Sequence, residues 1–262
     1  MKPAPFELLR PPTLGVAVAM LAETGAEARV LSGGQSLGPM LNLRVVQPRV
    51  LVQINHLPAL AGVAETAEAI VLGACVTHAA IAAGRTPDLG DGWLARIAGA
   101  IAYQAVRNRG TIGGSLCHAD PAADWVIVLT ALDASVVLQS TAGIRRMRLH
   151  DFVAGPYATR LAAGEILAAV NIPQRSAGAT WRYAKACRKP GEFAHAMGAL
   201  LLAGTTRRLV IGALGTRPLL LTGEQVSLDG ADAALAGLDA VDRHMQLTVV
   251  RRLLQDADAC AA

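Results

Sequence analysis

Two paired-glycine turns constrain this chain more than any other feature of its sequence. The first is Leu31-Ser32-Gly33-Gly34-Gln35-Ser36-Leu37, and it directly follows an expected strand over 28–31. The second, about eighty residues later, is Thr111-Ile112-Gly113-Gly114-Ser115. Paired glycines let the backbone adopt positive φ and approach a ligand closely, and successive N–H groups in such a turn form a nest for an anion. The pattern indicates either two cradles for the phosphates of one dinucleotide or two ordinary turns.

Neither turn has the spacing of the common nucleotide-binding motifs. Gly33-Gly34 lacks G-x-G-x-x-G, the glycine pattern of the dinucleotide-binding turn in Rossmann folds. The sequence G-x-x-x-x-G-K-[ST], which cradles phosphates in P-loop enzymes, does not occur in the chain. A simple NAD-dependent dehydrogenase and a P-loop nucleotide hydrolase are therefore both disfavoured.

Composition excludes several other classes of protein. The chain has 262 residues, of which 53% are apolar and 3% aromatic, and a net charge of +4 without a polybasic tract. A disordered chain and a nucleic-acid-binding surface are therefore not expected. The longest uncharged stretch, residues 69–84, is too short to span a membrane. The apolar segment 14–22, with Ala26-Glu27-Ala28 behind it, fits either a secretory leader or an amphipathic helix. Because Glu7 interrupts the charged leader, we expect the helix and a cytoplasmic protein.

The four cysteines do not form a metal-binding pattern. Cys75, Cys117, Cys187 and Cys260 are widely spaced, and C-x-x-C does not occur. Iron–sulfur and zinc sites built from this chain alone are therefore not expected. Reduced thiols are the expected state.

Helices and strands are expected to alternate through the first part of the chain. Helices are expected over 13–23, 36–43, 77–83, 94–102 and 121–132, a dense polar loop over 107–124, and strands over 28–31, 50–54, 59–65, 69–74, 135–138, 144–149 and 165–172. A domain boundary is expected within 173–180, where Pro, Ser and Gly gather. Beyond it we expect strands over 181–187, 208–214 and 218–221, and helices over 194–203, 231–238 and 245–254.

Polar residues gather behind the second turn. His118 is either an acid–base residue or a loop histidine that bonds to the backbone. Cys117 and His118 are poorly placed as a nucleophile pair, because neighbours on a strand point to opposite faces. Asp120 precedes Pro121 and is expected to cap a helix, and Asp124, one turn later, is expected to accept from a ligand hydroxyl. His195 is expected at the core edge of an alanine-rich helix.

The motifs taken in order resemble the FAD-binding medium subunit of the molybdenum hydroxylases, the xanthine dehydrogenase and carbon monoxide dehydrogenase type. The resemblance rests on both glycine turns, on His118-Ala119-Asp120-Pro121-Ala122-Ala123-Asp124, and on Lys185-Ala186-Cys187-Arg188 with Glu192-Phe193-Ala194. It covers nearly the whole chain. It implies an α+β fold: a vanillyl-alcohol-oxidase (PCMH)-type FAD-binding domain of two α/β subdomains over 1–175. A smaller C-terminal α+β domain, an antiparallel sheet plus helices, follows over 176–262.

The resemblance also implies a cofactor site. Both turns would bind the FAD pyrophosphate, Ile101 and Ala102 would lie against the adenine half, and Asp124 would bond a ribose or ribityl hydroxyl. Leu167 would pack on the flavin ring, with Lys185 and Phe193 near the isoalloxazine. The implied cofactor-binding set is Leu31, Ser32, Gly33, Gly34, Gln35, Ser36, Leu37, Ile101, Ala102, Thr111, Ile112, Gly113, Gly114, Ser115, Asp124, Leu167, Lys185 and Phe193, with no catalytic or metal-binding residue. Because residues 32–36 contain no histidine, noncovalent FAD is expected.

The function implied by the resemblance is electron transfer within a heterotrimeric molybdenum hydroxylase. A large molybdopterin subunit would hydroxylate the substrate, a small [2Fe-2S] subunit would pass electrons to FAD, and an external acceptor would receive them. A dimer of heterotrimers is expected. Two alternatives stay open: a stand-alone flavin oxidase or reductase of the same fold, and a scaffold that has lost its cofactor, which the intact glycines disfavour.

Overall fold

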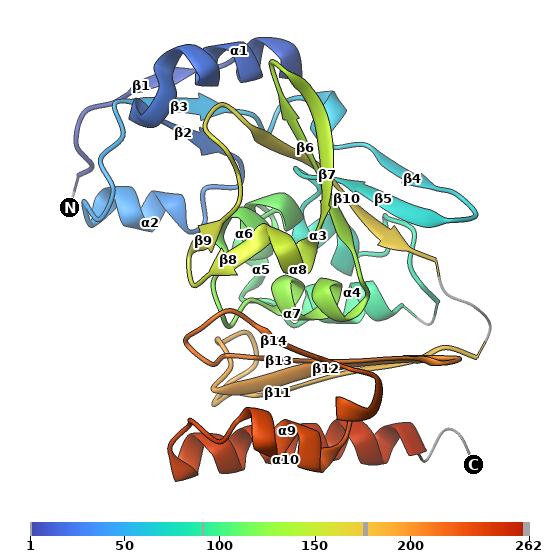
Figure 1. Cartoon of the computed structure of the whole chain (residues 1–262). Coiled ribbons are helices and arrows are strands. Elements are labelled where there is room, and N and C mark those ends of the chain that lie inside the picture. Colours follow the sequence, from blue (N-terminus) through green and yellow to red (C-terminus); the bar gives the residue numbers. More distant parts are fainter. Residues whose placement is uncertain (1, 91, 175–177, 259–262) are drawn as a thin grey trace.

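A small parallel sheet opens the fold of this computed structural model, which describes residues 2–90, 92–174 and 178–258. Strands β1 (Glu7–Leu9), β3 (Val50–Gln53) and β2 (Ala28–Leu31) lie in the order β1-β3-β2. Helix α1 (Leu14–Thr24) connects β1 to β2 and packs on the sheet (Figure 1). It begins where the Thr13 hydroxyl accepts from the N–H of Val16, the hydrogen bond of an N-cap. The helix and the strand expected here are confirmed.

A five-stranded antiparallel sheet forms the second layer. Its order is β4-β5-β10-β6-β7, and its strands span Val63–Glu65 (β4), Ala69–Gly73 (β5), Ile166–Pro173 (β10), Ser135–Ser140 (β6) and Gly143–Arg148 (β7). Strand β10 is central, pairs with both β5 and β6, and contains a bulge between Leu167 and Ala169. The alternating exposure of β6 reflects one buried face.

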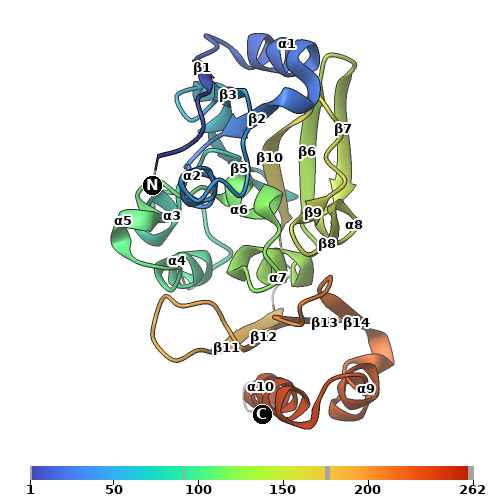
Figure 2. The ribbon, with the colours of Figure 1, turned by 90° about the vertical axis from the view of Figure 1, so that its left-hand side faces the viewer.

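Short helices fill the space below this sheet, and α2 to α5 lie in the chain between the two paired-glycine turns. They are α2 (Leu37–Asn42), α3 (His78–Ala82), α4 (Trp93–Gly99), α5 (Gln104–Arg107), α6 (Ile112–His118), α7 (Asp124–Ala131) and α8 (Leu149–Phe152), with strands β8 (Val153–Gly155) and β9 (Ala158–Thr159) and 3-10 turns at Gly25–Glu27 and Pro58–Leu60. All eight residues of α7 are buried. This helix forms the centre of the molecule, between the five-stranded sheet and the last layer (Figures 1 and 2).

A four-stranded antiparallel meander with two helices closes the chain. Its strands β11 (Thr180–Ala186), β12 (Ala196–Ala203), β13 (Thr206–Gly212) and β14 (Leu219–Thr222) lie in sequence order. One face packs against α7, and the other is covered by α9 (Leu228–Ala234) and α10 (Ala240–Asp258), with a 3-10 turn at Gly223–Gln225 before them (Figure 2).

Four expectations about local structure are wrong. Residues 194–203, expected as a helix, form strand β12 from Ala196; this strand is covered on both faces, so its apolar run lacks the alternation that marks a strand. His195 therefore lies before a strand, with an exposed side chain. The expected loop 107–124 contains α6, because the Thr111 hydroxyl caps it by accepting from Gly114 N–H at 3.1 Å. Cys117 and His118 are consequently neighbours on a helix, not on a strand.

Some expectations fall outside the described residues. The expected boundary 173–180 includes 175–177, and Cys260 lies in 259–262; both stretches are outside the described residues. The thiols of Cys75, Cys117 and Cys187 are free. Within the described ranges, no helix is both long and apolar enough to cross a membrane.

Candidate functional site

The fold brings the two paired-glycine turns into direct contact. The Ser32 Oγ lies 2.9 Å from the Thr111 Oγ1, so a hydrogen bond links residues that are 79 positions apart. A Cβ at Gly33 would lie 2.8 Å from the carbonyl carbon of Arg109 and 2.9 Å from the Cα of Gly110, and closer still to the Arg109 carbonyl oxygen. Glycine at position 33 is therefore required by the packing of one turn on the other.

The first turn supplies unused hydrogen-bond donors. The backbone N–H groups of residues 32–36 have no acceptor among the described residues. Gly34 has φ +73°, and the Gln35 side chain folds back so that its Nε2 donates to the Gly33 carbonyl at 3.2 Å. The turn joins the end of β2 to the start of α2, so its N–H groups are not used by a strand or a helix. Such a run of donors is suited to an anion.

The second turn is mostly occupied by the protein. The N–H groups of Ile112 and Gly113 donate to the carbonyls of Val76 (3.0 Å) and Ala74 (2.9 Å). A Cβ at Gly113 would lie 2.5 Å from the Cβ of Ala74, so the glycine is needed for close packing on the chain that follows β5. The second turn therefore packs against the first and offers few free N–H donors of its own. The sequence pattern did not indicate this difference between the two turns.

A buried ion pair joins α7 to the C-terminal sheet. The Nζ of Lys185, on β11, donates to the Asp124 Oδ1 at 2.8 Å, and both side chains are about 10% exposed (11% and 10%). The Tyr183 hydroxyl donates to the same oxygen at 2.6 Å. Burial, and then the adjacent Asp124 charge, raise the pKa of Tyr183, so its proton stays in place. Asp124 is the first residue of α7. Tyr183 was missed by the sequence analysis, although it shares a strand face with Lys185.

The Ala100–Ala102 turn lies beside this ion pair. The Lys185 Nζ also donates to the Ala100 carbonyl at 3.3 Å, and Ile101 forms a parallel bridge with Gly191 from the loop between β11 and β12. Ala102 has φ +44°, a conformation that is unfavourable for a residue with a Cβ. The turn therefore contacts the C-terminal sheet through two separate segments.

The comparisons with known proteins agree with this architecture. Residues 4–175 match the family described as the FAD binding domain in molybdopterin dehydrogenase. The chain belongs to this family. It is 34% identical over 258 residues to the 6-hydroxypseudooxynicotine dehydrogenase complex subunit alpha of Paenarthrobacter nicotinovorans, covering 92% of this chain and 87% of that protein. It is 37% identical over 196 residues to the carbon monoxide dehydrogenase medium chain of Hydrogenophaga pseudoflava, covering 75% and 68%.

Solved structures show the same fold. A carbon monoxide dehydrogenase structure from Hydrogenophaga pseudoflava, lacking the Mo-pyranopterin moiety of its molybdenum cofactor, matches with a TM-score of 0.89 and 33% identity over 99% of both chains. Quinoline 2-oxidoreductase from Pseudomonas putida 86 matches with a TM-score of 0.88 and 30% identity, over 100% of this chain and 99% of that chain. The molybdenum hydroxylase family, the α+β FAD-binding fold, the oxidoreductase class and FAD as its cofactor, all expected from the motifs, are confirmed.

The residues of this member of the FAD-binding family fit a dinucleotide. The unused N–H groups of 32–36 suit a pyrophosphate, which needs several donors in a concave turn. Among the described residues, no group of three His, Cys, Asp or Glu side chains is placed to hold a metal ion. The turn thus offers N–H donors of the kind that an oxyanion of a ligand could accept from.

Four further residues singled out in the sequence are Leu167, Phe193, His118 and Asp120. Leu167 is 3% exposed in the main core, on β10, and Phe193 is 65% exposed in the loop before β12. His118 ends α6, with its ring 5.1 Å from that of Tyr157. The expectation that Asp120 caps the helix is wrong: α7 begins at Asp124 behind Ala123 without a side-chain cap, and Asp120 accepts from Ala122 N–H at 2.8 Å in the preceding turn.

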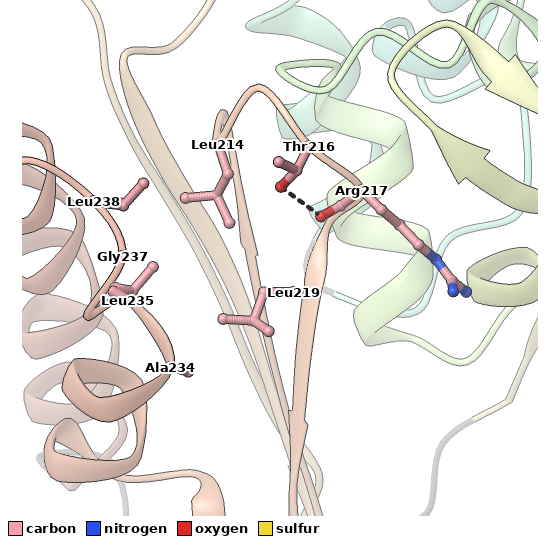
Figure 3. A pocket seen from close by; sticks show the side chains of 8 residues that line it. All are labelled: Leu214, Thr216, Arg217, Leu219, Ala234, Leu235, Gly237 and Leu238. Atoms are coloured by element: carbon pink, nitrogen blue, oxygen red, sulfur yellow. Dashed lines mark hydrogen bonds between the residues drawn. The ribbon is translucent and has the colours of Figure 1, made fainter.

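An apolar pocket lies far from the chemistry of the two turns. It has a volume of about 180 Å³ and lies between the β13–β14 turn and α9 (Figure 3). Leu214, Leu219 and Leu238 line it. The Arg217 guanidinium points away from it (Figure 3), and it donates to the His150 carbonyl. The side chains that face the pocket are apolar, and none of them can act as an acid, a base or a nucleophile.

Proposed function

We propose that this chain is the FAD-binding electron-transfer subunit of a heterotrimeric molybdenum hydroxylase. It would accept electrons from a [2Fe-2S] subunit and pass them to an external acceptor, while a large molybdopterin subunit hydroxylates the substrate. Support comes from the family to which the chain belongs and from relatives named as subunits of multi-subunit dehydrogenases. The observation that carries the proposal is the contact between the two glycine turns, with the N–H groups of 32–36 left without an acceptor among the described residues.

The chain's own residues would bind and orient the cofactor. Leu31–Leu37 would hold the pyrophosphate against Thr111–Ser115, and Ile101 and Ala102 would lie along the adenine half. FAD, when bound noncovalently, supplies one- and two-electron chemistry, which the protein positions and tunes. The Lys185 ammonium, fixed by Asp124 and the Ala100 carbonyl, would place a positive charge near the isoalloxazine. Leu167 and Phe193 would supply apolar contacts to the ring.

The ion pair changes what we infer for Asp124. Its Oδ1 already accepts from Lys185 and Tyr183, so any bond to a ribose or ribityl hydroxyl would be made by a carboxylate that is fixed in place. The proposal thus retains Asp124 in the site and adds a second effect, the orientation of Lys185.

Two further parts of the proposal concern organisation. We divide the chain into an FAD-binding domain over 1–175 and a C-terminal domain over 176–262, supported by the family match, which ends at residue 175, and by the new sheet that begins at Thr180. We also place the protein in the cytoplasm, as part of a dimer of heterotrimers.

The experiment that tests the function uses a complex isolated from the native host through an affinity tag on this chain. Molybdenum, iron and FAD are quantified, and the flavin and iron–sulfur absorbance are followed during stepwise photoreduction and re-oxidation. The proposal expects partner chains with all three cofactors, and a flavin that is reduced through the iron–sulfur subunit. A chain that purifies with FAD alone and oxidises a donor by itself would instead identify a stand-alone flavin oxidase.

A further inference from the structure

His78 is a buried histidine that packs beside the backbone leading into the second glycine turn. It is the first residue of α3, directly after the Thr77 cap, and it is only 5% exposed. Its own N–H donates to the Gly110 carbonyl at 2.9 Å, and Thr77 forms an antiparallel bridge with Thr111. The start of α3 therefore runs along the segment that carries the second turn.

The imidazole ring of His78 is held in one orientation by Trp125. The Trp125 Nε1 lies 3.1 Å from the His78 Nδ1. An indole nitrogen can only donate, so Nδ1 accepts and the ring carries its proton on Nε2. Burial, and then the charge of Arg107, lower the pKa of His78 to about 4, so the ring is neutral at pH 7 and Nδ1 stays free to accept. Because Trp125 is a fully buried residue of α7, this hydrogen bond ties the ring to the central helix.

The other edge of the ring lies against Gly110. A Cβ at Gly110 would lie 2.8 Å from the Cδ2 and 3.0 Å from the Nε2 of His78. There is consequently no room for a methyl group between the ring and the backbone at this position. Gly110 does not have a positive φ, so the need for glycine comes from this packing and not from the backbone conformation.

Gly110 also contacts the first glycine turn. Gly33 packs on it so closely that a Cβ at Gly33 would lie 2.9 Å from the Gly110 Cα. One backbone residue thus touches both the imidazole ring and the turn whose N–H groups, at 32–36, have no acceptor among the described residues. A change in the size of the ring should therefore move Gly110, and with it the surface on which the first turn rests.

We propose that His78 is a positioning residue of the dinucleotide site: its ring, oriented by Trp125, fixes Gly110, and Gly110 fixes the first glycine turn so that its N–H groups are placed for a pyrophosphate. This inference rests on the proposed function and deepens it, because it assigns the geometry of the two turns to a residue that belongs to neither of them. The imidazole ring is enclosed by protein and acts through Gly110.

The test exchanges the sizes of the two neighbours and measures the affinity of the flavin-free full chain for FAD by calorimetry. His78→Ala removes the ring, and Gly110→Ala adds a methyl group against it. Each change should displace the first turn and lower the affinity for FAD by at least about tenfold, the loss that one hydrogen bond to a charged group represents. The double variant should recover part of that loss, because the new methyl group occupies space that the ring has left.

Two further variants separate positioning from general damage to the fold. Leu221→Ala shortens a buried side chain of the cluster between the C-terminal sheet and its two helices, so it should lower the stability of the chain and leave the affinity for FAD unchanged. His78→Asn is smaller than the wild-type residue and keeps an acceptor for Trp125, so a smaller loss of affinity is expected. This variant replaces His78→Ala, alone and in the double variant, if His78→Ala does not fold.

Three results would overturn the inference: FAD binding by either single variant that equals the wild type, a double variant that binds FAD no better than the single variants, or a loss of FAD affinity in Leu221→Ala as large as that in His78→Ala. A wild-type chain that does not bind FAD would instead refute the proposed function.

Discussion

Replacing Gly33 by alanine tests whether the two turns must touch for the site to form. The added Cβ would lie 2.8 Å from the carbonyl carbon of Arg109 and 2.9 Å from the Cα of Gly110. All of these neighbours are backbone atoms, which cannot rotate away as a side chain can. The turns must therefore separate by several tenths of an ångström or more. The 2.9 Å hydrogen bond between the Ser32 and Thr111 hydroxyls must then lengthen.

The magnitude follows from two contributions. Overpacking of a tight contact costs about 1–3 kcal/mol of unfolding free energy. Displacing the turn weakens at least one N–H bond to the pyrophosphate, and a hydrogen bond to a charged group contributes about 1.5–3 kcal/mol. We therefore expect the affinity of Gly33→Ala for FAD to fall by about ten- to a hundredfold, measured by titration of the flavin-free chain with FAD.

Gly62→Ala is the matched control. A Cβ at Gly62 meets nothing within 4 Å, and Gly62 does not have a positive φ. This variant should bind FAD as tightly as the wild type. If Gly33→Ala binds FAD as tightly as Gly62→Ala, the contact between the turns does not shape the site, and the reasoning is refuted.

Three other predictions concern groups that are buried or partly buried. Lys185→Met leaves Asp124 buried without its partner and should lower the unfolding free energy in urea by about 3–5 kcal/mol, whereas the double variant with Asp124→Leu should recover most of it; a single variant as stable as the wild type contradicts the ion pair. His78 has a pKa lowered to about 4 by burial and then by Arg107. The unfolded chain therefore binds a proton at higher pH than the folded chain, and unfolding free energy should fall as the pH drops from about 6.5 to about 4, by about 3 kcal/mol in total. His78→Gln should remove that part of the pH dependence, and an unchanged profile would show that His78 is not its source. Burial raises the pKa of the Cys117 thiol to about 12, so this cysteine should resist a thiol reagent at mildly alkaline pH in the native protein and react in denaturant; rapid native labelling would contradict this.

The sequence predicted those parts of the fold that local signals specify. Thr13 and Thr77 each cap the helix that follows them, and β10 ends at Pro173. The hairpin of β6 and β7 was expected from two short strand segments on either side of Gly143, whose φ is +123°. Each of these features depends on residues that are close in the sequence.

The sequence did not predict features that depend on distant partners. Strand β12 is covered on both faces, so its run of alanine, leucine and methionine is equally typical of a buried helix. The bond from Tyr183 to Asp124 joins residues 59 positions apart, and no spacing rule connects them. The packing of Gly33 on Arg109 is likewise invisible in the sequence, where both glycine pairs resemble ligand-binding turns.

The most direct test of the central claim is the flavin content of the chain purified alone. A visible spectrum is recorded, the protein is precipitated with acid, and the flavin in the supernatant is identified and quantified. We expect about one equivalent of FAD to be released, without metal-cluster absorbance, as for a noncovalent cofactor held by the protein. A colourless protein that also fails to bind added FAD, both alone and in the complex from its native host, would contradict the assignment of the two glycine turns to an FAD site.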